Sequence, residues 1–471
     1  MLVVLRPLSD RGVSFKWVTE MIDFFDKILM CQTKLDGRSV AGKFLLSEEG
    51  IKVKLVDFEG SLHLPEKSSL ILELEDCRYA TLLAKTHGLG SSWSETLSNS
   101  YNTITAYIAV VGFRPWLETD RIKSLNFTFS DSNEMLFAPD IRQKISQHRN
   151  RFPDSKIFEF SIDGLTITTG YYISKEILND VFVTKGFYCN INFEDGKDIS
   201  DIGEALFKAQ TFFSFVAGGT IEFEDYTIET VHRDTGKLPT GSDLQRNHFD
   251  LVWPSRLNNS SKSEYSIRSY LCCWDKENRE IFENCFSKWI ASWPKWSKAI
   301  NGLFISLGRQ NNYDGDRLLN ACKWLESTPG ADQNKVKLSG DLNELIKYAT
   351  EKANNLSTTE ASRVKNALKN LSTESRNSLL DRLLERANRL TKIQNVEPMK
   401  KDIHAAFATR GKFAHSKFHF NHQDDFQKSV QQIQAVEALA FMLLIAELPL
   451  PLDFDRIPEF YPLSSYLVYQ H

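Results

Sequence analysis

The stretch FEFSIDGLTI, residues 158–167, alternates apolar and polar side chains on both sides of an Asp-Gly pair. Such alternation places the apolar side chains on one face of a strand. Asp-Gly favours the two-residue turn of a hairpin, because both turn positions need a positive φ. The stretch therefore predicts two antiparallel strands joined at Asp163–Gly164.

The same period of two recurs through the first 230 residues. It is clear in IKVKL at residues 51–55, and residues 104–111 and 220–231 are predicted as further strands. Residues 201–215 are instead predicted as one helix that packs on the sheet. The first half of the chain thus reads as rich in β-structure.

The pattern changes after a polar segment, residues 232–265, that contains Gly, Pro, Ser and Asn throughout. Such a composition is typical of a connection, and beyond it the apolar period becomes 3.6. We expect a β-rich N-terminal domain at 1–265 and an all-α helical bundle at 266–471, a fold of class α+β. Helices are predicted at 275–290, 313–325, 342–353, 375–390, 399–409 and 426–448.

Composition excludes several classes of protein. The 471 residues are 42% hydrophobic and 25% charged with a net charge of −4, which excludes a disordered chain, a collagen and a polycation that coats nucleic acid. Seven scattered cysteines without a C-x-x-C pair favour a reducing, cytoplasmic location. The first ten residues lack the apolar core of a signal peptide. Residues 435–450 contain two glutamates and fall short of the roughly 20 residues that span a bilayer, so they predict a buried helix and no membrane partner.

Positive charge is concentrated in the helical half. Residues 335–417 contain 17 Lys and Arg against 9 Asp and Glu. Such a patch would attract phosphates, although the same charges also suit solvated helix faces, where Glu385 and Arg389 form an i,i+4 pair. The patch includes Arg376, Arg382, Arg386, Arg389 and Lys392.

Within the patch, Arg410 and His415 have the side chains that metal-free RNA cleavage requires. An imidazole with a pKa near 6.5 can take the proton of a ribose 2′-hydroxyl, and a guanidinium can stabilise charge on the phosphate. On an unbroken helix the two positions lie about 140° apart. Either Gly411 breaks the helix, or two copies of the motif meet across a dimer axis. The neighbouring Lys412, Lys417 and His419 are predicted contacts to RNA.

The motif Arg410-x4-His415 resembles the R-x(4–6)-H motif of HEPN-domain ribonucleases, and the arrangement is similar to ApeA-like anti-phage HEPN proteins. Residues 40–44 with 50–55, residues 104–112 and the leucine-rich segment 317–326 are also similar to that family. The resemblance implies a HEPN-like nuclease bundle with Arg410, His415 and Glu326 as catalytic residues and without a metal or cofactor.

The resemblance also implies a biological setting. The family's members are cytoplasmic, toxin-like endoribonucleases of abortive infection, act as homodimers or higher oligomers, and cleave cellular RNA such as transfer RNA. The N-terminal domain would be the sensor or regulator, which responds to a phage-derived trigger.

Two other functions remain open from the sequence. Gly411 stands where many HEPN motifs have a polar residue, which favours a non-catalytic adaptor that binds RNA or protein. His415, His419 and His422 share one helix face, so a metallohydrolase is the other alternative. The match of residues 37–44 to a P-loop is rejected, because Phe44 replaces the Ser or Thr that binds magnesium and strand-like alternation follows.

Overall fold

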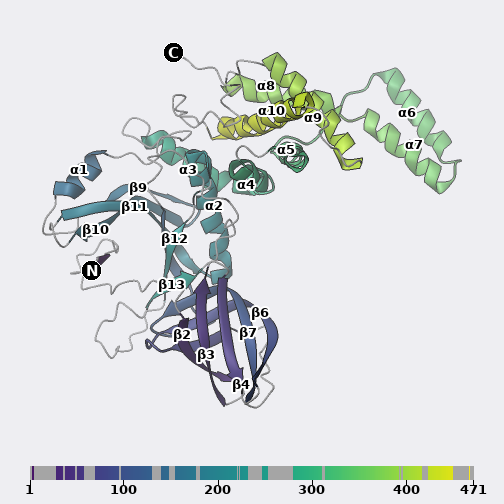
Figure 1. The fold of residues 1–471 in the computed structure, drawn as a ribbon. Coiled ribbons are helices and arrows are strands. Elements are labelled where there is room, and N and C mark those ends of the chain that lie inside the picture. Colours follow the sequence, from purple (N-terminus) through teal and green to yellow (C-terminus); the bar gives the residue numbers. More distant parts are fainter. Residues whose placement is uncertain are drawn as a thin grey trace. The chain divides into compact units, whose positions relative to one another are not determined.

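The computed structural model divides into two compact units (Figure 1). Unit 1 comprises Met1–Phe213, Ile221–Arg268 and Cys273–Glu283, and unit 2 comprises Ser214–Thr220, Ser269–Cys272 and Asn284–His471. The structure describes residues 3–4, 28–35, 38–47, 50–57, 69–94, 97–129, 139–147, 154–176, 181–219, 221, 223–231, 247–252, 279–309, 313–391, 393, 396–415, 423–448 and 466.

Unit 1 is built on one sheet of 13 strands, and all of its pairings are antiparallel. With the mostly helical unit 2, this confirms the α+β class. The strands are β1 (Val3–Val4), β2 (Ile28–Leu35), β3 (Arg38–Ser47), β4 (Gly50–Asp57), β5 (Leu70–Leu74), β6 (Tyr79–Ser94), β7 (Leu97–Gly112), β8 (Ile122–Phe129), β9 (Lys156–Ile162), β10 (Leu165–Glu176), β11 (Val181–Lys197), β12 (Glu224–Thr230) and β13 (His248–Val252).

Strands β2 to β7 close into a ring, because β6 pairs with both β5 and β7. Alternate side chains of these strands point inward and form a continuous apolar core that includes Phe44, Val53 and Leu72. The P-loop-like stretch lies here, where Arg38–Ser47 is a strand in register with β2. The other edge of β7 is shared, since its residues 100–106 pair with β4 and 109–111 pair with β13.

The hairpin predicted from residues 158–167 is present. Ile162 of β9 faces Leu165 of β10, and the turn residues Asp163 and Gly164 have φ values of 49° and 73°. Both are the positive values that the Asp-Gly pair predicts.

An aromatic core joins the open part of the sheet to helix α2 (Ile199–Ala217). The Phe129 ring lies 4.9 Å from that of Phe213 on α2 and 5.5 Å from that of Phe187, and the rings of Phe127 and Phe223 stack at 4.1 Å. The predicted helix at 201–215 is therefore α2, packed on the sheet. A further helix, α1 (Pro139–Gln147), packs against β11.

All six helices predicted for the second half of the chain are present, with ends that differ by a few residues. The helices of this half are α3 (Arg279–Trp296), α4 (Ile300–Arg309), α5 (Gly315–Glu326), α6 (Gly340–Ala353), α7 (Thr358–Leu371), α8 (Arg376–Thr391), α9 (Val396–His415) and α10 (Gln423–Glu447). Helices α4 and α7 were not predicted. Both are amphipathic: in α4 the buried Ile300, Leu303, Phe304 and Leu307 form an apolar stripe, although two glycines, which are unfavourable in a helix, lie among them, and α7 is rich in polar residues.

Helix α10 is the core of the bundle. The carboxylate of Glu437, 2% exposed, receives two hydrogen bonds of 2.9 and 2.8 Å from the guanidinium of Arg317 on α5, which is 1% exposed. Burial opposes the charge of Arg317, but the hydrogen bond and charge of Glu437 outweigh it, so the pKa of Arg317 is raised. The buried helix expected from residues 435–450 is thus accounted for by the end of α10.

Asp425–Glu447 is long and apolar enough to cross a bilayer, with a mean hydropathy of 1.4. However, 72% of this window is buried within the protein, and core helices of bundles meet the same criterion.

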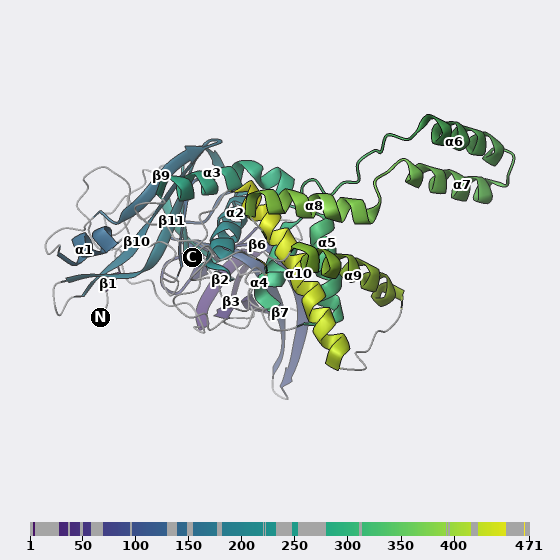
Figure 2. The same ribbon diagram turned by 90° about the horizontal axis from the view of Figure 1, so that it is seen from above.

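Helices α6 and α7 form a hairpin inserted between α5 and α8 (Figure 2). Its two chain ends run antiparallel, with hydrogen bonds from Val336 N to Ser372 O and from Glu374 N to Asn334 O. The carboxylate of Glu374 accepts hydrogen bonds from the guanidinium of Arg382, which lowers the pKa of Glu374. The base of the hairpin is therefore tied to α8.

Candidate functional site

An ion pair joins the end of α5 to α9. The Nη1 atom of Arg410 lies 2.5 Å from Oε1 of Glu326, and the two side chains are 29% and 35% exposed. The structure thus brings together two of the three residues predicted to be catalytic. It places them at the surface of the bundle, where a ligand can reach them.

Helix packing explains why both side chains lie there. Helix α5 starts at its N-cap Asp314, which accepts a hydrogen bond from the Arg317 N–H, and ends with the buried Leu325 directly before Glu326. On α9 the buried residues Met399, Ile403, Ala406 and Phe407 form one stripe. Arg410 follows Phe407 by three residues, so it continues this stripe at its edge.

A second guanidinium borders the same aromatic ring. The guanidinium carbons of Arg410 and Arg376 lie 5.9 and 6.0 Å from the centre of the Phe407 ring, a cation–π distance. Arg376 is the exposed first residue of α8. Within the described part of the chain it has no carboxylate partner, so its charge is available to a ligand.

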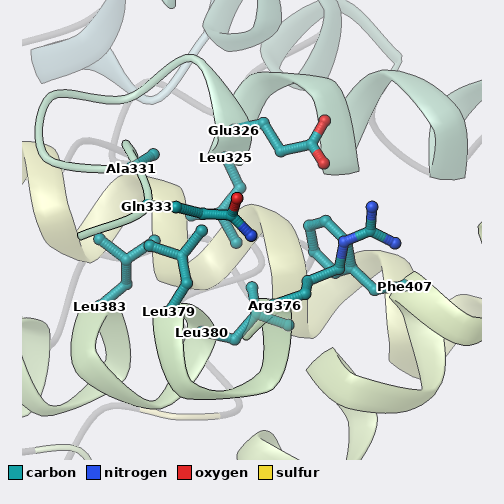
Figure 3. Close-up of a pocket in the computed structure, with 9 residues that line it drawn as sticks. All are labelled: Leu325, Glu326, Ala331, Gln333, Arg376, Leu379, Leu380, Leu383 and Phe407. Atoms are coloured by element: carbon teal, nitrogen blue, oxygen red, sulfur yellow. The ribbon is translucent and has the colours of Figure 1, made fainter. Parts of the chain in front are cut away.

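A pocket of about 250 Å³ opens beside the ion pair (Figure 3). Its lining is mostly apolar, with the polar groups of Glu326, Gln333 and Arg376 pointing into it. The lining residues are Leu325, Glu326, Ala331, Gln333, Arg376, Leu379, Leu380, Leu383 and Phe407.

Cys322, which precedes Glu326 by one helical turn, is not a nucleophile in this setting. Its side chain is buried, and burial raises the pKa of its thiol to about 12, although the nearby charge of Arg410 acts in the opposite direction. The thiol is therefore protonated at neutral pH, and the thiolate that attacks substrates is absent.

Helix α9 continues through Gly411 to His415, so the predicted helix break at Gly411 is wrong. Neighbouring turns on both sides hold the residue in helical geometry, and a single glycine costs only about 1 kcal/mol there. Positions 410 and 415 accordingly lie about 140° apart around one helix. Of the two predicted arrangements, the one in which the Arg410-x4-His415 motifs of two copies meet across a dimer axis stays a prediction.

The remaining predicted contacts to RNA are not described by the structure. The side chains of Lys412 and His415 lie outside the described residues, as do Lys417 and His419 entirely. The predicted metal-binding face of His415, His419 and His422 also falls there. Among the residues that are described, no group of three or more His, Cys, Asp or Glu side chains could hold a metal ion.

Gly411 offers a test of this continuous helix. A Cβ atom added there meets nothing within 4 Å, whereas one added at Gly302 in α4 would lie 2.1 Å from Cγ of Trp324. We expect Gly411→Ala to raise the free energy of unfolding by about 1 kcal/mol. The matched substitution Gly302→Ala should lower it by about 1–3 kcal/mol. Denaturant unfolding of both variants measures this, and a destabilised Gly411→Ala variant would contradict the helical assignment.

Much of the predicted basic patch is already paired within the protein. Arg382 binds Glu374 and the carbonyl oxygens of Gly330 and Asp332. Arg386 binds Glu447 and the carbonyl of Pro329. These two arginines fasten the segment after α5 and the end of α10 to α8, so they act as internal ties, unlike either the free phosphate contacts or the solvated helix-face charges that the sequence suggested. Lys392 lies outside the described residues.

Sequence reasoning missed one polar cluster between α8 and α9. Nε2 of His404 lies 2.9 Å from Oδ1 of Asp381, and Nζ of Lys400 lies 3.0 Å from Oδ2 of the same residue. The hydrogen bond to Asp381 raises the pKa of Lys400. Since Asp381 is 23 positions before His404, no local spacing signals this cluster, which joins the two helices.

Comparison with known proteins adds no assignment to this geometry. No family model, no curated protein and no solved structure matches the chain.

Proposed function

We propose that unit 2 is a metal-independent endoribonuclease of the HEPN type, in which Arg410 binds the scissile phosphate. The observation that carries the proposal is the ion pair of Arg410 and Glu326, whose side chains are 29% and 35% exposed, beside a pocket that Arg376 also lines. The guanidinium of Arg410 provides the forked donors that phosphate oxygens accept, and the nearby charge of Arg376 adds to the attraction for a phosphodiester.

The proposed reaction uses the 2′-hydroxyl of the substrate. His415 takes the hydroxyl proton, the 2′-oxygen attacks phosphorus while the bond to the 5′-oxygen breaks, and the protonated His415 or water gives a proton to the departing 5′-oxygen. The products are a 2′,3′-cyclic phosphate and a 5′-hydroxyl. Arg410 stabilises the negative charge that grows on the phosphate oxygens in the transition state.

Glu326 is a positioning residue in this scheme. Its carboxylate fixes the guanidinium of Arg410 through one nitrogen and leaves the other donors to the phosphate. A fixed guanidinium loses less conformational entropy when the substrate binds.

The continuous helix α9 favours a site that is shared between two copies of the chain. Positions 410 and 415 diverge on one unbroken helix, so Arg410 of one copy and His415 of another would face a shared phosphate in a homodimer. The resemblance to ApeA-like proteins extends the proposal to anti-phage defence in the cytoplasm, with cellular RNA such as transfer RNA as the substrate and unit 1 as the regulator.

The test is cleavage of labelled RNA in EDTA. The full chain should cut RNA without a metal ion, and His415→Ala should lower the rate by about 10²–10⁴-fold, the contribution of a general base. An unchanged melting temperature separates this loss from unfolding. Cleavage by His415→Ala at the wild-type rate would end the proposal, and activity that EDTA removes would favour a metallohydrolase.

A non-catalytic adaptor is the second candidate. The observation that favours it is the internal pairing of Arg382 with Glu374 and of Arg386 with Glu447, which reduces the positive charge that is free to act on RNA. An adaptor would retard RNA in a native gel and leave it intact, whereas the enzyme shortens it.

A further inference from the structure

The pocket beside Glu326 has the size and walls of a site for one planar ring system. Its volume of about 250 Å³ equals the share of roughly eight liquid waters, which is enough for a purine base. One side is formed by the buried leucines Leu379 and Leu383, and Phe407 lies at the same pocket. A bare phosphate or a sugar would leave these apolar walls unmatched.

The polar groups of the pocket come from three separate elements. Figure 3 shows the carboxylate of Glu326, the amide of Gln333 and the guanidinium of Arg376 directed toward the same space. Glu326 ends α5, Gln333 lies between α5 and α6, and Arg376 begins α8. A pocket with apolar walls and a few convergent polar groups is the usual form of a small-molecule or base site.

These groups select among the bases. An ionised carboxylate only accepts hydrogen bonds, and a guanidinium only donates them. Guanine has N–H donors at N1 and N2 next to acceptors at O6 and N7, and an arginine bound to O6 and N7 is its commonest specific contact. Because Arg410 contacts Oε1 of Glu326, the second carboxylate oxygen remains for the N1 or N2 donor.

Uracil and adenine fit less well. Uracil presents two carbonyl oxygens that a carboxylate repels. Adenine has no acceptor at position 6 for Arg376, because its exocyclic group there is an amine. Unpaired bases of single-stranded RNA are commonly read by such edge contacts and by packing on aromatic or arginine planes.

We propose that this pocket binds a guanine base, and that it seats the guanosine next to the phosphate cut at Arg410. The inference rests on the proposed ribonuclease function for its RNA ligand. Glu326 then has two contacts, one with Arg410 and one with the Watson–Crick edge of guanine, while Arg376 and Gln333 donate to O6 and N7.

The first experiment uses four uridine-rich RNA oligonucleotides that differ at one central position, which is G, A, C or U. In EDTA, the wild-type chain should cut next to G at least about tenfold faster than next to the other bases, as one bidentate contact predicts. Arg376→Ala should abolish this preference. Arg363→Ala, which removes an exposed arginine of α7, should retain it and serves as the control.

The second experiment measures binding without cleavage. The His415→Ala chain should bind 5′-GMP at least about tenfold more tightly than 5′-AMP in calorimetry, and Ala331→Leu, which fills the pocket, should abolish the difference. Gln333→Ala should likewise reduce the difference between GMP and AMP. Because Gln333 is an exposed side chain, this variant is the test to use if Ala331→Leu fails to fold.

The outcomes separate the two proposals. Equal cleavage of all four oligonucleotides, with equal binding of GMP and AMP, would overturn the guanine site and leave the ribonuclease intact. No cleavage, with GMP binding that depends on Arg376, would support the guanine site and overturn the ribonuclease.

Discussion

Glu437→Ala is expected to lower the free energy of unfolding of unit 2 by about 3–5 kcal/mol, because it leaves the guanidinium of Arg317 buried without its counter-charge. Arg317 also lies over the Tyr313 ring at 4.3 Å, so it has no short route to solvent. For 150–250 residues this corresponds to a fall in melting temperature of roughly 2–4 °C per kcal/mol. Thermal unfolding followed by circular dichroism measures the effect.

Two control variants show that the loss comes from an unpaired buried charge. The double substitution Arg317→Met with Glu437→Leu removes both charges and should recover most of the stability. Arg121→Ala breaks an ion pair with Asp198 whose side chains are 45% and 51% exposed, and should cost below about 1 kcal/mol. A Glu437→Ala variant as stable as Arg121→Ala would show that the buried pair is not a structural tie.

Arg410→Ala is expected to lower RNA cleavage by about 10²–10³-fold, the usual loss when one group that stabilises transition-state charge is removed. Since the side chain of Arg410 is partly exposed, at 29%, its loss should leave the melting temperature within a few degrees of the wild type. The rate under single-turnover conditions in EDTA is the measurement.

Mixing two inactive variants tests whether the site is shared between copies. In a symmetric dimer, an Arg410→Ala chain paired with a His415→Ala chain keeps one intact Arg–His combination. After random subunit exchange, about half of the dimers contain one copy of each variant, and each of these has one of its two sites intact. The mixture should therefore recover about a quarter of the wild-type rate. No recovery after subunit exchange would place both residues of each site in the same copy and contradict the proposed dimer.

Local patterns predicted the fold where the deciding contacts are close in sequence. The Asp163–Gly164 turn and α2 follow directly from alternation, turn chemistry and helical period. The ring of β2 to β7 could not be predicted, because its closure depends on β5 pairing with β2, and no local signal encodes which strand lies next to which. Helix α4 was missed since Gly302, unfavourable in a helix, is needed to accommodate Trp324.

The candidate site divides in the same way. Arg410 was singled out by its chemistry and Glu326 by a family resemblance, and the two lie in contact, whereas their roles remain predictions. The pocket was not foreseen, because Gln333, Arg376 and Phe407 belong to different elements that only the tertiary fold brings together. The sequence also contained no signal that Arg382 pairs with Glu374. The number of basic residues in the patch is therefore larger than the number whose charge is available to a ligand.

Strand β7 belongs to both the closed ring and the open part of the sheet, since it pairs with β4 over one half of its edge and with β13 over the other. A hinge between the two parts would have to break the hydrogen bonds of this ladder, so β7 couples the ring to the strands beyond it. A force applied to the ring would therefore reach β13 and the open part of the sheet through the hydrogen bonds of β7.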